Sequence, residues 1–121
     1  MIRIAHIVNP VKVEEDNELY WQQPITYESM RVAQRFSNFD DNVELWATGY
    51  DEDPLPYGFE NAGILTDSTL GMGFKTERKL PFFKDILDNL YEHSDADYFI
   101  QTNADIGVMP YFYKSVTDML K

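Results

Sequence analysis

The pattern of apolar and polar positions first predicts the strands. Residues 2–8 are mostly apolar, which is typical of a strand buried on both faces of a parallel sheet. Pro10 should end this strand, because proline cannot donate a ladder hydrogen bond. Apolar and polar residues alternate over 43–47, which predicts a second strand nearer the edge of the sheet. A short strand over 63–66 and a buried strand over 97–102 complete the set.

Helical spacing of apolar residues predicts three helices between and after these strands. After a polar loop over 11–24, Thr26 is the expected N-cap of a helix over 27–39. The clearest helix begins at Leu80 and ends near His93, with an apolar stripe made of Phe83, Ile86, Leu87, Leu90 and Tyr91. The last helix begins near Pro110, and its stripe consists of Phe112, Val116, Met119 and Leu120.

Strands that alternate with helices predict one α/β domain over residues 1–121. We expect a Rossmann-like, open and mostly parallel sheet with helices on both faces. The segment 49–79 holds five of the 6 glycines and reads as a long loop. Such a loop is either a binding segment or a surface connection.

Composition then excludes several classes of protein. The chain has 121 residues, no cysteine and a formal net charge of −11. Disulfide scaffolds and zinc fingers need cysteine, and binding to nucleic acid or to anionic lipid needs a basic surface. No apolar run approaches the roughly 20 residues of a membrane span, and no signal peptide is recognisable. We therefore expect a cytoplasmic protein.

Candidate chemistry lies after the two buried strands, because open α/β sheets bind ligands at the carboxyl ends of their strands. Asn9 and Pro10 follow the first strand, and Asn103 and Asp105 follow the strand over 97–102. In an extended chain, residues two apart point the same way. Asn103 and Asp105 would then offer an amide oxygen and a carboxylate to Mg²⁺ or Mn²⁺ held with a substrate diphosphate. The other interpretation is that both residues only cap a turn.

The sequence from Arg78 to Leu87, then Asp95-Ala96-Asp97-Tyr98, then Thr102-Asn103-Ala104-Asp105-Ile106, resembles nucleotide-sugar glycosyltransferases of the GT-A fold. In that fold a buried strand ends in an acidic DxD element that holds a divalent metal on the sugar-nucleotide diphosphate. The resemblance places Asn103-Ala104-Asp105 at this element, with Asn in place of its first Asp, so Asp105 is the better metal ligand. It also implies that Asn9 and Pro10 lie beside the nucleoside and that Arg78 lies near the diphosphate.

The resemblance implies a metal-dependent transfer of a sugar to an unknown acceptor, in a chain that corresponds to the N-terminal, donor-binding half of such enzymes. It identifies no catalytic base. A second hypothesis is a non-catalytic α/β interaction module, a truncated or degenerate GT-A-like domain that forms a homo-oligomer through the edge of its sheet. A third is another phosphate-handling enzyme that uses Asp105 and a metal.

The remaining distinctive residues have structural or binding interpretations. His6, in the middle of a predicted strand, is expected to be a hydrogen-bonded core residue. His93 is expected to cap the carboxyl end of its helix, where it interacts favourably with the helix dipole. Tyr57 and Phe59, in the long loop, are candidates to stack on a base or a sugar. No dinucleotide-binding glycine motif and no Walker A motif is present.

Overall fold

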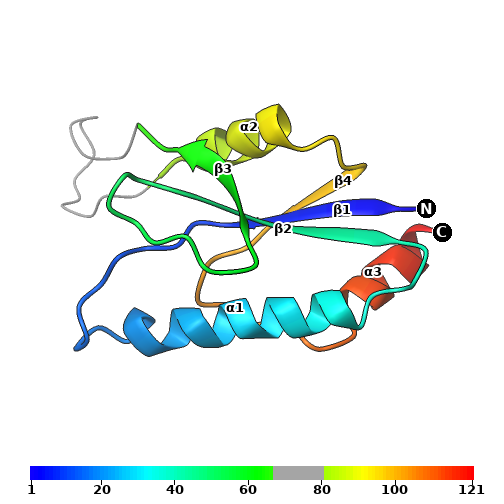
Figure 1. Cartoon of the computed structure of the whole chain (residues 1–121), viewed down its shortest axis with the longest axis horizontal. Helices are drawn as coiled ribbons and strands as arrows, with labels where there is room; N and C mark the ends of the chain where they lie inside the picture. Colours follow the sequence, from blue (N-terminus) through cyan, green and yellow to red (C-terminus); the bar gives the residue numbers. More distant parts are fainter. Residues whose placement is uncertain (67–80) are drawn as a thin grey trace.

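A parallel sheet of four strands, in the order β3-β2-β1-β4, forms the centre of the computed structural model (Figure 1). The structure describes residues 1–66 and 81–121. The strands are β1 (Arg3–Val8), β2 (Asn42–Gly49), β3 (Glu60–Ile64) and β4 (Tyr98–Gln101). The helices are α1 (Leu19–Arg35), α2 (Phe83–His93) and α3 (Phe112–Leu120).

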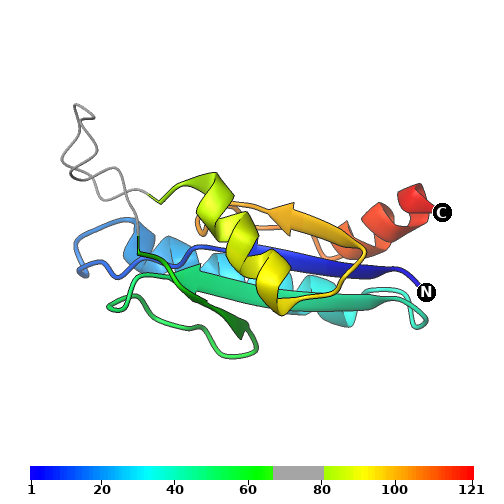
Figure 2. The same ribbon diagram turned by 90° about the horizontal axis from the view of Figure 1, so that it is seen from above.

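Helices cover both faces of the sheet. Helices α1 and α3 lie on one face, and α2 crosses the other (Figures 1 and 2). This arrangement explains why β1 is apolar on both sides. Val8 packs in the core between the sheet and α1, while Ala5 and Ile7 pack in the core between the sheet and α2. The predicted α/β fold with an open parallel sheet is therefore confirmed. Within the described residues, no helix is both long and apolar enough to cross a membrane.

Helix α1 begins eight residues earlier than the sequence predicts, at Leu19 instead of residue 27. The N-cap, Glu18, makes no side-chain cap bond, and Asn17 before it accepts two amides of the first turn: Leu19 N–H on its side-chain oxygen at 2.9 Å and Tyr20 N–H on its carbonyl at 2.9 Å. Pro24 lies inside the helix, where it removes one backbone donor and conceals the first turns from a reading of the sequence. Thr26 is therefore not an N-cap but a buried residue within the helix.

Strand β2 is also placed differently from the prediction. It lies between β3 and β1 in the interior of the sheet, not near its edge. Its buried polar residue, Thr48, has hydrogen-bond partners on both sides: it donates to the carbonyl of Gly63 at 2.8 Å and accepts from Asn89 of α2 at 2.9 Å. Trp46 donates its ring N–H to Glu44 at 2.8 Å. Only the first half of the predicted 63–66 strand lies in β3, which begins earlier, at Glu60, and ends at Ile64.

The two C-terminal helices bury narrower faces than their apolar stripes predict. In α2 only Ile86 and Leu90 are buried, while the stripe residues Phe83, Leu87 and Tyr91 are exposed. In α3 the buried residues are Tyr113 and Thr117, and the stripe residues Met119 and Leu120 are exposed. The predicted start at Leu80 lies outside the described residues, and α2 itself begins at Phe83.

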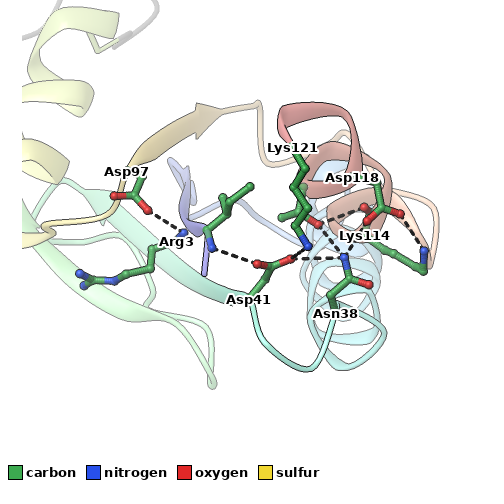
Figure 3. Close-up of polar contacts among 9 residues, drawn as sticks. Arg3, Asn38, Asp41, Asp97, Lys114, Asp118 and Lys121 are labelled. Atoms are coloured by element: carbon green, nitrogen blue, oxygen red, sulfur yellow. Dashed lines mark hydrogen bonds and ion pairs between the residues drawn. The ribbon is translucent and has the colours of Figure 1, made fainter.

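A polar network joins the amino ends of the strands to α3 (Figure 3). The Asp41 carboxylate accepts the Ile2 N–H at 2.9 Å and forms an ion pair with Lys121 at 3.0 Å. Asn38, which follows α1, donates to Thr117 at 3.1 Å and to Asp118 at 2.8 Å. The backbone hydrogen bond from Ile2, followed by the bond from Lys121, lowers the pKa of Asp41 to about 2. This network holds the end of the sheet opposite the candidate site.

Candidate ligand-binding site

The order in which the chain adds strands to the sheet reverses between β1 and β4, and a cavity of about 330 Å³ lies there. The chain passes from β1 outward through β2 to β3 and then returns to the other side of β1 as β4. At such a switch point the loops after the two neighbouring strands diverge and leave a crevice. The cavity volume falls in the range of small-ligand pockets, roughly 300–1,000 Å³.

The lining of the cavity combines apolar walls with polar groups. Apolar side chains come from the loop after β1, the start of α1, the region of α2 and the loop after β4: Val11, Leu19, Pro81, Phe83, Ile86 and Ala104. Polar side chains come mainly from the carboxyl ends of β1 and β4: Asn9, Gln23, Gln101, Thr102, Asn103 and Asp105. This combination is the usual one for a site that orients a small molecule.

Three of the predicted site residues line this one cavity: Asn9, Asn103 and Asp105. Pro10 is buried and does not line it, and Arg78 lies outside the described residues. Ile106 N–H donates to the Asn103 carbonyl at 3.3 Å, so residues 103–106 form a turn and not the extended segment assumed in the prediction. Asn103 and Asp105 are nevertheless both exposed on the cavity wall.

Asn9 is held in place by a hydrogen bond from its side-chain nitrogen to the Thr48 carbonyl at 2.8 Å. This bond joins the carboxyl ends of β1 and β2. The Asn9 side-chain oxygen accepts no hydrogen bond from the other described residues, so it is available as an acceptor beside the cavity. A half-buried amide fixed in this way suits recognition of an N–H group on a ligand.

Gln23 fastens the loop after β1 to α1, and the sequence alone did not identify it. Its amide forms two 2.8 Å hydrogen bonds with the backbone of Val11, one as acceptor and one as donor. Tyr27 donates its hydroxyl to the same Gln23 oxygen at 3.1 Å. Apolar residues at helical spacing from Leu19 could have indicated a helix in this part of the wall. Pro24 argues against a helix there, because proline is unfavourable inside helices.

His6 contacts the β4 side of the cavity wall through Thr102. Its Nε2 lies 2.7 Å from Thr102 Oγ1, which lines the cavity, and its Nδ1 lies 2.6 Å from the Tyr113 hydroxyl. Burial lowers the pKa of His6 to about 4, so the ring is neutral near pH 7. A neutral ring donates from one nitrogen and accepts at the other, and both hydroxyls can serve either role. The prediction of a satisfied core histidine agrees with this geometry.

The aromatic side chains proposed for stacking lie elsewhere. Phe59 is buried in the core beneath α1, with its ring centroid 5.6 Å from that of Tyr27. Tyr57 is stacked under the Arg31 guanidinium, 3.8 Å from ring centroid to Cζ. Neither lines the cavity, so neither is placed to stack on a base or a sugar bound there. Among the described residues that line the cavity, the aromatic side chain is that of Phe83, which is exposed there.

The donor set suits a divalent metal only when a ligand supplies further oxygens. Asp105 is the one carboxylate among the described lining residues, and Asn103 and Asn9 add amide oxygens. Within residues 1–66 and 81–121, no three acidic, histidine or cysteine residues gather as a metal site. Mg²⁺ commonly binds through one or two carboxylates together with substrate phosphates. The residues present therefore fit a metal bound jointly with a diphosphate, and not a metal held by protein alone.

Comparison with models of protein families, with curated proteins and with solved structures finds no match to this chain.

Proposed function

We propose that the cavity binds a nucleotide sugar together with Mn²⁺ or Mg²⁺, as the donor site of a glycosyltransferase-like domain. The observation that carries this proposal is that Asn9, Asn103 and Asp105, which come from opposite ends of the chain, line one cavity at the switch point of the sheet. The residues that resemble the GT-A donor site thus lie where an open α/β sheet binds ligands.

Each part of the ligand has a matching group. The free Asn9 oxygen would accept an N–H of the nucleobase, and Phe83 would cover one face of the base. Asp105, assisted by Asn103, would hold the metal on the diphosphate. When bound, the metal would supply positive charge that stabilises the leaving diphosphate.

The net charge of the chain supports the involvement of a cation. With a formal charge of −11, the protein repels a free diphosphate unless a positive charge lies at the site. A divalent ion reverses the local sign of the potential. Arg78 would add a second positive charge, and this assignment stays a prediction.

A thermal-shift titration tests the proposal. UDP and GDP are added with and without Mn²⁺, and the melting temperature is recorded. At ten times Kd, binding to the folded state adds about 1.4 kcal/mol of stability, which corresponds to several degrees for a domain of this size. We expect the shift only when nucleotide and Mn²⁺ are both present. If neither UDP nor GDP shifts the melting temperature in the presence of Mn²⁺, the proposal is refuted.

A matched pair of variants locates the metal. Asp105→Asn should abolish the Mn²⁺-dependent shift, whereas Asp40→Asn, an equivalent change of an exposed aspartate in the turn before β2, should retain it. Sugar nucleotides and simple phosphomonoesters are compared as ligands, because preference for the latter would indicate another phosphate-handling enzyme. Release of free UDP from a UDP-sugar, measured with a coupled assay, tests for transfer or hydrolysis.

The alternative is a non-catalytic interaction module. It is favoured by the single carboxylate among the described lining residues of the cavity. This alternative predicts no metal-dependent binding of any nucleotide in the same titration, so one experiment separates the two proposals.

A further inference from the structure

The two edges of the sheet differ in how they are protected. Edge strand β3 carries the charged Glu60, a shift of register against β2, and Gly63 with a φ of 107°. Such charges and irregularities prevent an edge from pairing with another strand. Edge strand β4 reads Tyr-Phe-Ile-Gln, has no charge or proline, and pairs in regular register with β1. Among the described residues no strand covers its outer side.

Apolar side chains of α2 project on the β4 side of the molecule. Asn89 and His93 lie on the flank of α2 that faces β3. Asn89 donates a hydrogen bond to Thr48, and the side chains of Asn89 and His93 lie against Gly63 of β3. Leu87 is two residues from Asn89, about 200° around the helix, and Tyr91 lies one turn further along. Leu87 is 38% and Tyr91 77% exposed, so this flank is an open apolar row.

Helix α3 provides a second row on the other face of the sheet. Thr117 and Asp118 contact Asn38 at the end of α1, so that flank of α3 faces α1. Val116 lies about 200° around the helix from Asp118, and Met119 lies beside it, one turn along. Met119 is 78% exposed and Val116 is half-buried. The bare β4 edge therefore lies between two apolar rows, one in each helical layer.

We propose that the β4 edge is the interface of a homodimer, in which β4 pairs antiparallel with β4 of a second copy. A lone extended peptide would pair with the strand but leave both apolar rows exposed. A partner that covers strand and rows together must itself have an edge strand between two apolar helical layers, and the same edge of a second copy has this shape. A two-fold axis perpendicular to the sheet brings like rows together. Pairing of this kind is independent of the ligand proposed above.

The available surface is consistent with a reversible dimer. Taking about 200 Å² for an aromatic side chain, the exposed parts of Tyr91 (77%) and Tyr98 (44%) amount to roughly 240 Å². Leu87, Met119 and the strand backbone add to this area. A standard interface buries about 800 Å² per partner, and interfaces at or below this size include weak, transient complexes. We therefore expect a weak dimer, and take a Kd on the order of 10–100 µM as the range to be tested. Two chains of charge −11 repel each other, and salt should therefore strengthen the dimer.

Sedimentation equilibrium at 1–300 µM protein, in low and in 0.5 M NaCl, tests the proposal. We expect the mass to rise from 14.2 kDa toward twice that value, with a lower Kd at high salt. Leu87→Lys and Met119→Lys, on separate helices, should each raise the Kd at least tenfold, although each makes the chain less acidic. The control Leu55→Lys makes the same change at a residue that is 52% exposed in the loop before β3, and it should leave the Kd within twofold.

Hydrogen exchange then identifies the paired strand. The outward amides of β4 should exchange more slowly at 300 µM than at 1 µM, and this difference should disappear in Leu87→Lys. Circular dichroism verifies that each variant is folded. A chain that is monomeric at every concentration and salt overturns the proposal, and so does a dimer that neither lysine at the β4 edge weakens, or that Leu55→Lys weakens as much.

Discussion

The buried imidazole of His6 makes the stability of the fold depend on pH in a range where most carboxylates remain ionised. Its two nitrogens are hydrogen-bonded to Tyr113 and Thr102, and burial lowers its pKa from 6.5 to about 4. Below pH 6.5 the unfolded chain binds a proton that the folded chain rejects. Stability is therefore fully present above pH 6.5 and is lost as pH falls toward 4.

The size of the effect follows from the shift of the pKa. One unit corresponds to 1.36 kcal/mol, so the complete loss is about 3 kcal/mol, reached below pH 4. Between pH 7.5 and 5.0 linkage gives about 2 kcal/mol from His6 alone. This is a large fraction of the 5–15 kcal/mol by which domains are stable.

Urea unfolding at pH 7.5 and 5.0, followed by circular dichroism and by tryptophan fluorescence, to which the buried Trp46 and the exposed Trp21 contribute, measures this loss. His6→Gln should be less stable than the parent at pH 7.5, because at least one buried hydroxyl loses its partner at a cost of about 1–3 kcal/mol. Its own stability should change by less than about 1 kcal/mol between the two pH values. His93→Gln should keep the dependence of the parent chain. An equal fall in His6→Gln and the parent, or an NMR titration of the His6 ring near pH 6.5, would refute the reasoning.

Two further predictions concern the core and the network at the amino ends of the strands. Leu90→Ala should lower the free energy of unfolding by about 2–5 kcal/mol, because Leu90 of α2 is fully buried. Leu55→Ala, at an exposed site, should change the free energy of unfolding by less than about 0.5 kcal/mol in the same urea titration. Asp41→Asn should lower the melting temperature at pH 6, and the difference from the parent should vanish as pH falls from about 4 to about 2, since the pKa of Asp41 is lowered to about 2 by its bonds to Ile2 and Lys121. Asp40→Asn serves as the control, and a difference from the parent that persists below pH 2 would contradict the assignment.

The sequence predicted those features that depend on neighbouring residues. The apolar run of β1 needs two helical layers wherever it lies, and the period of α2 predicts burial of Ile86 and Leu90. Strand ends that carry Asn9 and Asp105 must lie at the same edge of a parallel sheet. The fold class and the meeting of these residues at one cavity were therefore predictable, while the ligand itself stays a proposal.

Only the tertiary structure decided the features that depend on distant partners. The interior position of β2 follows from hydrogen bonds that satisfy its polar face, such as that between Thr48 and Asn89, and no local pattern reveals them. Helix α3 buries Tyr113 in preference to Met119 because His6, 107 residues away in the sequence, binds the Tyr113 hydroxyl. An apolar stripe specifies that a helix has a face to bury, but the neighbours brought together by folding decide which residues are covered and which remain open at the β4 edge.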